Sequence, residues 1–131
     1  MRFRLIPLLL FTFILFSCRK NEGFKTPLVG NWELSETFDG YANGGKFIWQ
    51  PVPASAITKL SFSATNGYTS DCPANNKTCI GTYLLKGSNA IEISSNCNYE
   101  ALTYTITELT SKSLILDYQV REGVIREKYV K

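Results

Sequence analysis

The chain of 131 residues carries 14 lysines and arginines against 11 acidic residues, and it contains no histidine. Its charges are nearly balanced and form no basic run, which excludes the electrostatic footprint of a nucleic-acid-binding protein. The lack of histidine removes the commonest general acid–base group and the commonest metal ligand.

The first residues have the pattern of an export signal. Arg2 and Arg4 precede an apolar run from Leu5 to Phe16, and Cys18 follows shortly after. The run is shorter than the roughly 20 apolar residues that a membrane-spanning helix requires. A positive start, a short apolar core and a small residue at the end are typical of a secretory signal peptide.

The end of this stretch, Ser17-Cys18, resembles the lipobox of bacterial lipoproteins. The resemblance implies a signal peptide over residues 1–17 and a diacylglycerol on the thiol of Cys18, which would anchor the protein to a membrane. Arg19 follows Cys18, which by the same resemblance favours the outer membrane of a bacterial cell envelope. An ordinary secreted protein with a chance cysteine at the cleavage site is the alternative.

Residues 18–27 are expected to form a lipidated tether. The segment is polar and charged, it ends at Pro27, and we expect it to be disordered. Residues 28–131 have the size of one domain.

Alternation of apolar and polar residues, with turn signals between the runs, predicts an all-β domain. In Asn31–Phe38, the alternation places Trp32 and Leu34 on one face together with Phe38. The expected strands are Asn31–Phe38, Lys46–Val52, Ala56–Ala64, a strand starting at Tyr68–Ser70, Cys79–Lys86, Ala90–Ser95, Glu100–Thr107, Ser113–Val120 and Val124–Val130.

Two turns predict strand registers. A three-residue turn at Gly87-Ser88-Asn89 would place Tyr83 opposite Ile93. A turn at Arg121-Glu122-Gly123 would pair Tyr118 with Arg126.

Strands with one apolar face must bury that face by closing or by pairing. Because hairpins follow one another along the chain, we expect an antiparallel up-and-down β-barrel of about eight strands. A two-sheet sandwich is the alternative.

Gly30-Asn31-Trp32, at the start of the first strand, matches the G-x-W motif of the lipocalins. Further segments resemble the small lipocalin-like lipoproteins of Gram-negative bacteria: Leu60-Ser61-Phe62, Asn66-Gly67-Tyr68, Gly81-Thr82-Tyr83 and Arg126–Tyr129. The resemblance implies that Trp32 packs across the closed base of the barrel. It also implies an arginine over the indole, for which Arg126 is the candidate.

Three cysteines remain after Cys18. The register of the Gly87–Asn89 hairpin places Cys79 opposite Cys97, at a distance that a disulfide spans. Pairings of Cys72 with Cys79 or with Cys97 are the alternatives. We expect no metal, because three cysteines without histidine lack the usual fourth ligand.

No catalytic group is expected, since no nucleophile elbow or phosphate-binding loop appears. Outward-facing carboxylates on strands are ordinary solvation, and nothing selects a catalytic pair from them. The strand glutamates are Glu33, Glu36, Glu92, Glu100, Glu108 and Glu127.

We therefore expect a non-enzymatic, lipid-anchored envelope protein without cofactor. Its partner would be the membrane and either a small apolar ligand or an envelope protein; a scaffold module and a hydrolase inhibitor are the alternatives. Candidate ligand contacts are the aromatic residues Phe47, Trp49, Phe62, Tyr83 and Tyr104, for which core or rim packing is the competing interpretation.

Overall fold

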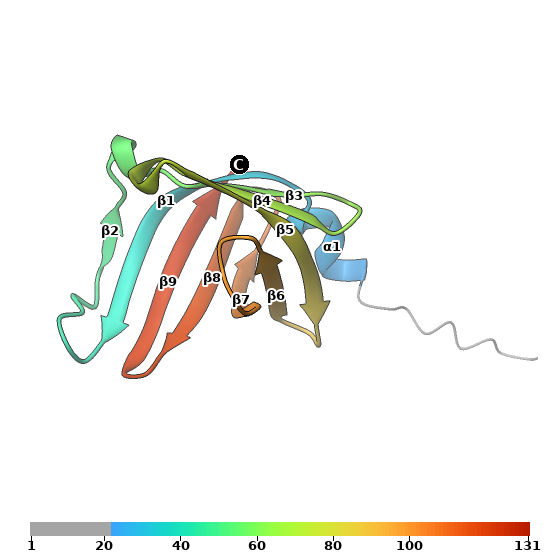
Figure 1. The fold of residues 1–131 in the computed structure, drawn as a ribbon. Coiled ribbons are helices and arrows are strands. Elements are labelled where there is room, and N and C mark those ends of the chain that lie inside the picture. The colour runs from blue at the N-terminus through green and yellow to red at the C-terminus, as the bar shows by residue number, and fades with distance from the viewer. Residues whose placement is uncertain (1–21) are drawn as a thin grey trace, which may run out of the picture.

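A computed structural model describes residues 22–131, so the predicted signal peptide and Cys18 lie outside the described residues. The described part is almost entirely β-structure, as expected (Figure 1). Its elements are α1 (Glu22–Leu28), β1 (Gly30–Tyr41), β2 (Trp49–Pro51), a 3₁₀ turn (Ala54–Ala56), β3 (Lys59–Phe62), β4 (Gly67–Cys72), a second 3₁₀ turn (Pro73–Asn75), β5 (Lys77–Lys86), β6 (Ala90–Ser95), β7 (Leu102–Leu109), β8 (Ser113–Val120) and β9 (Gly123–Val130). Within this range no helix has the length and apolar character to cross a membrane.

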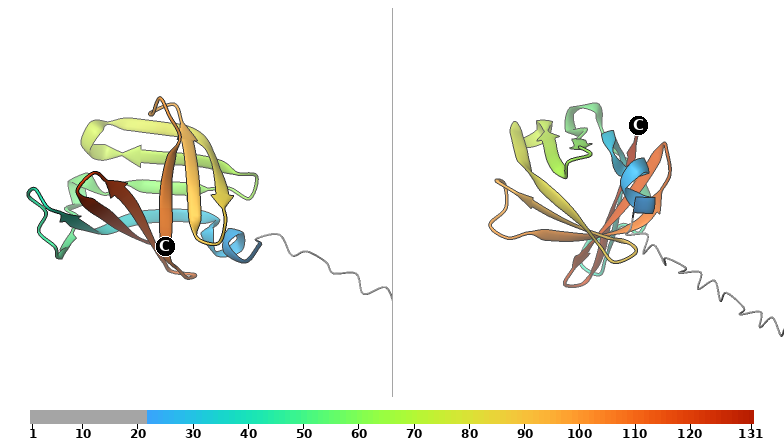
Figure 2. Two further views of the ribbon diagram at one scale, coloured as in Figure 1. Left: turned by 90° about the horizontal axis from the view of Figure 1, so that it is seen from below. Right: turned by 90° about the vertical axis from the view of Figure 1, so that its right-hand side faces the viewer.

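The sheet closes into an antiparallel barrel of eight strands, which confirms the predicted architecture over the sandwich. From β3 to β9 each strand pairs with the next along the chain, and β1 pairs with both β3 and β9. The short β2 lies against the second half of β1 and is not one of the eight. The two views in Figure 2 show the sheet curling around a single interior.

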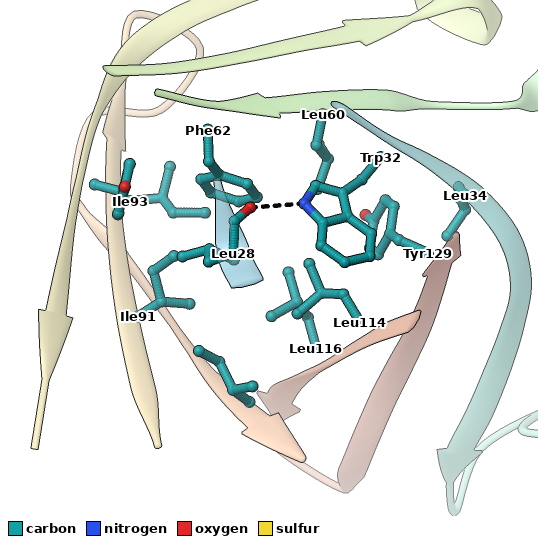
Figure 3. Close-up of a cluster of buried hydrophobic side chains, with 12 residues drawn as sticks. Leu28, Trp32, Leu34, Leu60, Phe62, Ile91, Ile93, Leu114, Leu116 and Tyr129 are labelled. Atoms are coloured by element: carbon teal, nitrogen blue, oxygen red, sulfur yellow. Dashed lines mark hydrogen bonds between the residues drawn. The ribbon is translucent and has the colours of Figure 1, made fainter. Parts of the chain in front are cut away.

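The main hydrophobic core fills the end of the barrel where β1 begins. Trp32 and Leu28 are fully buried there, and the Trp32 Nε1–H donates a 2.8 Å hydrogen bond to the Leu28 carbonyl (Figure 3). The buried residues are Leu28, Trp32, Leu34, Leu60, Phe62, Tyr83, Ile91, Ile93, Ile106, Leu114, Leu116 and Tyr129. The core side chains and α1 therefore close this end of the barrel.

The prediction that residues up to 27 are disordered is wrong for the segment from Glu22, which forms α1. The segment is ordered because it buries an apolar side chain in the core and because two of its backbone carbonyls accept hydrogen bonds. Leu28 is buried in the core, and Lys131 Nζ donates hydrogen bonds of 2.9 Å to the carbonyls of Pro27 and Val29.

A β-bulge at Ser35 changes which residues of β1 face the interior. The register with β9 shifts between Leu34 and Glu36, the Ser35 hydroxyl donates to the Lys128 carbonyl at 3.0 Å, and the Ser35 carbonyl accepts from Val52 N at 3.0 Å. An extra residue in one strand moves all later side chains to the opposite face. The prediction that Phe38 shares a face with Trp32 is therefore wrong.

One predicted hairpin register is confirmed and the other is wrong by one residue. In the β5–β6 hairpin, Tyr83 pairs with Ile93 as expected. In the β8–β9 hairpin, Tyr118 pairs with Ile125 instead of Arg126. Gly123 follows this turn with φ +155°, and a Cβ there would lie 2.1 Å from the Gly40 carbonyl oxygen, so close approach to β1 requires glycine.

Candidate functional site

The end of the barrel opposite α1 holds the candidate site. Here β1 ends and the β8–β9 hairpin turns, and the strand registers place Tyr41, Val120 and Ile125 on the inner face. These three side chains, with Asn43 and the turn Arg121-Glu122, line a hollow of about 310 Å³. Two larger hollows, of about 370 and 420 Å³, lie beside α1 and over the outer residues of β1, β3 and β4.

Glu127 lies deeper on the same inner face, two positions along β9 from Ile125. Its neighbours in the sheet are Thr37 on β1 and Leu116 on β8. The Tyr129 hydroxyl donates a 2.6 Å hydrogen bond to Glu127 Oε2. Burial raises the pKa of Glu127 above its ordinary value, and the hydrogen bond from Tyr129 opposes this in part.

Four tyrosines from four strands surround this carboxylate; we call Tyr68, Tyr104, Tyr118 and Tyr129, together with Glu127, the inner tyrosine–glutamate cluster. The rings of Tyr104 and Tyr118 lie 5.5 Å apart. Burial, and next the negative charge of Glu127, raise the pKa of both Tyr104 and Tyr129. For Tyr68, burial raises the pKa most strongly and Glu127 adds to it. Tyr68, Tyr104 and Tyr129 therefore stay neutral and present O–H groups.

Glu127 has no cationic partner among residues 22–131. The ion pairs of this range lie on the outer wall, where Lys59, Lys86, Arg126 and Lys128 pair with Glu33, Glu92, Asp117 and Glu36 respectively. A buried carboxylate is normally either paired with a cation or kept neutral by a raised pKa. The inner wall supplies no cation from residues 22–131, and burial raises the pKa of Glu127.

One oxygen of the Glu127 carboxylate is also free to accept a hydrogen bond. Within the described range Oε2 accepts from Tyr129, and no donor reaches Oε1. Ser113 Oγ is the one fully buried side-chain polar atom of that range without a partner, so Oε1 is not completely enclosed. The cluster thus combines aromatic rings, hydroxyl groups and a carboxylate oxygen with free acceptor capacity inside the barrel.

Among solved structures, the chain is similar to a lipocalin-like protein from Bacteroides uniformis ATCC 8492, with 21% sequence identity and a TM-score of 0.58 over 80% of this chain and 98% of that chain. The fold is lipocalin-like. At this identity the likeness establishes the fold alone. No family model and no curated protein matches the sequence.

At the base of the lipocalin-like barrel, Gly30 and Trp32 lie where the motif predicts, but the expected contact of Arg126 with Trp32 is not formed. Arg126 lies on the outer wall, where its Nε–H donates to Asp117 at 2.9 Å and its guanidinium lies 5.6 Å from the Phe38 ring centroid. The one-residue difference in the β8–β9 register explains this, because it turns Arg126 away from the interior. Lys131 takes the position over the indole.

The candidate ligand contacts separate into three groups in the lipocalin-like barrel. Phe62 and Tyr83 pack edge to face in the closed core, with ring centroids 5.1 Å apart. Tyr104 belongs to the inner tyrosine–glutamate cluster. Phe47 and Trp49 pack against Phe38 on the outer wall, and so they do not line the interior.

The predicted disulfide is confirmed: Cys79 and Cys97 are bonded, with Cα atoms 5.5 Å apart, near the open end of the barrel. Cys72 is half-buried and free. No group of potential metal ligands occurs in residues 22–131.

The sequence did not single out Glu127 as a site residue; it predicted an outward, solvated carboxylate there. The signal was ambiguous because both faces of β9 carry apolar residues: Ile125 and Tyr129 face inward, while Val124 and Val130 face outward. Only the length of the preceding turn, which sets the register of β9 against β8, determines which of the two faces points inward.

Proposed function

We propose that this protein is a non-enzymatic binding protein that takes a small amphipathic molecule into the open half of its lipocalin-like barrel. The observation that carries the proposal is the inner tyrosine–glutamate cluster, which lies beneath the hollow lined by Tyr41, Val120 and Ile125. We call this hollow the rim hollow. Ligand sites combine apolar and aromatic walls with a few convergent polar groups. The hollow of about 310 Å³ is at the small end of the range for such sites, which favours a small ligand.

Anchoring through Cys18 is the second part of the proposal. Only Arg19, Lys20 and Asn21 separate Cys18 from the start of α1. An extended chain spans at most about 3.6 Å per residue, so α1 would lie within about 15 Å of a lipidated Cys18. Since α1 is at the closed end, the open end would then point away from the membrane and take its ligand from the aqueous phase of the envelope.

A direct test of ligand binding uses a neutral fluorescent probe, N-phenyl-1-naphthylamine, with the purified protein. Ile125→Trp fills the rim hollow from the inner face and should abolish the rise in fluorescence. Val124→Trp, one residue earlier and on the outer face, is the matched control and should bind like the wild type. Equal binding by both variants would place any probe site outside the barrel and refute this part of the proposal.

The anchor has its own test, which is independent of ligand binding. Cys18→Ala should move the protein from the membrane fraction to the soluble fraction after cell lysis. Continued membrane attachment of this variant would refute lipidation at Cys18.

An interaction with an envelope protein is the second candidate function. The outer wall beside the open end carries Phe47, Ile48 and Trp49, of which Phe47 and Ile48 are each 58% exposed. Exposed apolar residues in contiguous groups favour protein partners. If neither the wild type nor Val124→Trp binds the probe, this candidate becomes the stronger one.

A further inference from the structure

We propose that the ligand of the inner tyrosine–glutamate cluster is a cation: a small amphiphile with a protonated amine, which pairs with Glu127. The inference rests on the proposed function, because it names the chemical class of the ligand for the same site. It is drawn from the polarity of the interior.

The outer and inner walls of the barrel differ in how their carboxylates are paired. On the outer wall, Glu33, Glu36, Glu92 and Asp117 each lie within 3.0 Å of a lysine or arginine nitrogen. On the inner wall, Glu127 has only the Tyr129 hydroxyl as a partner in residues 22–131. A buried carboxylate without a cationic partner is stabilised most by a ligand that supplies the missing positive charge.

Other titratable groups also face the Glu127 carboxylate. The titratable groups of the packed strands are Tyr68 on β4, Tyr104 on β7, Tyr118 on β8 and Tyr129 on β9, and Asp39 on β1 shares the inner face nearer the rim. None of these groups is a base, and the basic residue that lines the hollow, Arg121, lies in the turn at the rim. An anionic headgroup beside Glu127 would be repelled by the carboxylate or would be buried without a cationic partner. A cationic headgroup would pair with the carboxylate, and the surrounding aromatic rings also attract cations.

The position of Glu127 relative to the rim determines how a ligand could reach it. Glu127 Oε1 has free acceptor capacity and is not completely enclosed. Ile125, two residues nearer the rim on the same strand face, lines the hollow. An amine that reaches Oε1 would therefore leave its apolar part among Ile125, Val120 and Tyr41.

The test compares three ligands of one chain length, octylamine, octanol and octanoate, by isothermal titration calorimetry with the purified protein. The wild type should bind octylamine roughly tenfold or more tightly than octanol, as expected for a hydrogen bond between charged partners, and should bind octanoate most weakly. Glu127→Gln keeps the size of the side chain and should bring octylamine to the affinity of octanol. Glu108→Gln, an exposed glutamate on the outer face of β7, is the control and should keep the tenfold preference.

The pH dependence in the wild type supplies a second measurement that needs no variant. Octylamine stays protonated below about pH 9, as lysine does, so a change in its affinity reports ionisation in the protein. Its affinity should rise with pH as Glu127 loses its proton, while the affinity of octanol should not rise. Asp39→Asn should retain this rise if Glu127 is the responsible group.

The outcomes separate the two proposals. If octanol and octylamine bind equally to the wild type, ligand binding stands and the cation assignment is overturned. If the preference for octylamine survives in Glu127→Gln or disappears in Asp39→Asn, Glu127 is not the recognition group. If none of the three ligands binds, the proposed function fails and the inference falls with it.

Discussion

Lys131 lies over the indole of Trp32, with its Nζ 4.4 Å from the ring centroid. The same ammonium group donates to the carbonyls of Pro27 and Val29, so it joins the last strand, the first strand and α1. One lysine therefore supplies the cation that the motif led us to expect from Arg126.

Replacing Lys131 should loosen the closed end of the barrel. Lys131→Met keeps much of the apolar stem but removes the charge, and it should lower the free energy of unfolding by about 1 kcal/mol through loss of the cation–π contact and the two hydrogen bonds. Urea denaturation of the purified protein measures this. Lys112→Met, an exposed lysine at the same end, is the control; equal effects of the two variants would show that the contact with Trp32 contributes nothing.

Trp32 itself should carry a much larger share of the stability. Its side chain is fully buried and its Nε1–H satisfies the Leu28 carbonyl, so Trp32→Ala should cost about 3–5 kcal/mol. The chain offers a matched control in Trp49→Ala on the outer wall, which should cost about 1 kcal/mol or less. The midpoint and slope of urea unfolding, followed by circular dichroism, test the comparison. A small loss for Trp32→Ala would contradict its role as the base of the core.

The strands and their order were predictable because alternation and turn chemistry are local properties of the sequence. Asn66-Gly67 and Gly87–Asn89 lie at turns whose flanking strands pair as expected, and the second of these fixed the position of the disulfide. The closed barrel followed from the order of hairpins. These features depend on residues close together in the chain.

The errors have one physical origin: a shift of one residue reverses the two faces of a strand. The bulge at Ser35 is held by Lys128 and Val52, which lie far away in the chain, so the run around Ser35 gives no sign of it. The tighter turn at Arg121-Glu122 reverses β9. Together these two shifts moved Phe38 and Arg126 outward and brought Glu127 into the interior, so the fold was predictable but the site was not.

The disulfide near the open end should stabilise the domain through the loop that it closes. Cys79 and Cys97 are 18 residues apart, and a loop of this size contributes roughly 3 kcal/mol by restricting the unfolded chain. The double variant Cys79→Ser/Cys97→Ser should show this loss in urea denaturation. Cys72→Ser, which removes a free thiol on the neighbouring strand, should change the stability little; a large loss there would mean that Cys72 has a packing role of comparable weight.

Glu127 should make the stability of the protein depend on pH in a definite direction. Its folded-state pKa is raised by burial, so the folded protein holds this proton more tightly than the unfolded chain does. The resulting stabilisation is fully present below the unfolded pKa, near 4.5, and is lost as the pH rises through the higher folded value. Glu127→Gln cannot lose this proton, so its free energy of unfolding relative to the wild type should increase over that pH window and then level off.

Urea denaturation of both proteins from pH 4 to pH 8 measures the difference, with Glu108→Gln as the control expected to show no such trend. A constant difference between wild type and Glu127→Gln across the window would mean that Glu127 is not desolvated inside the barrel, and a decreasing one would mean that a cation stabilises its charged form.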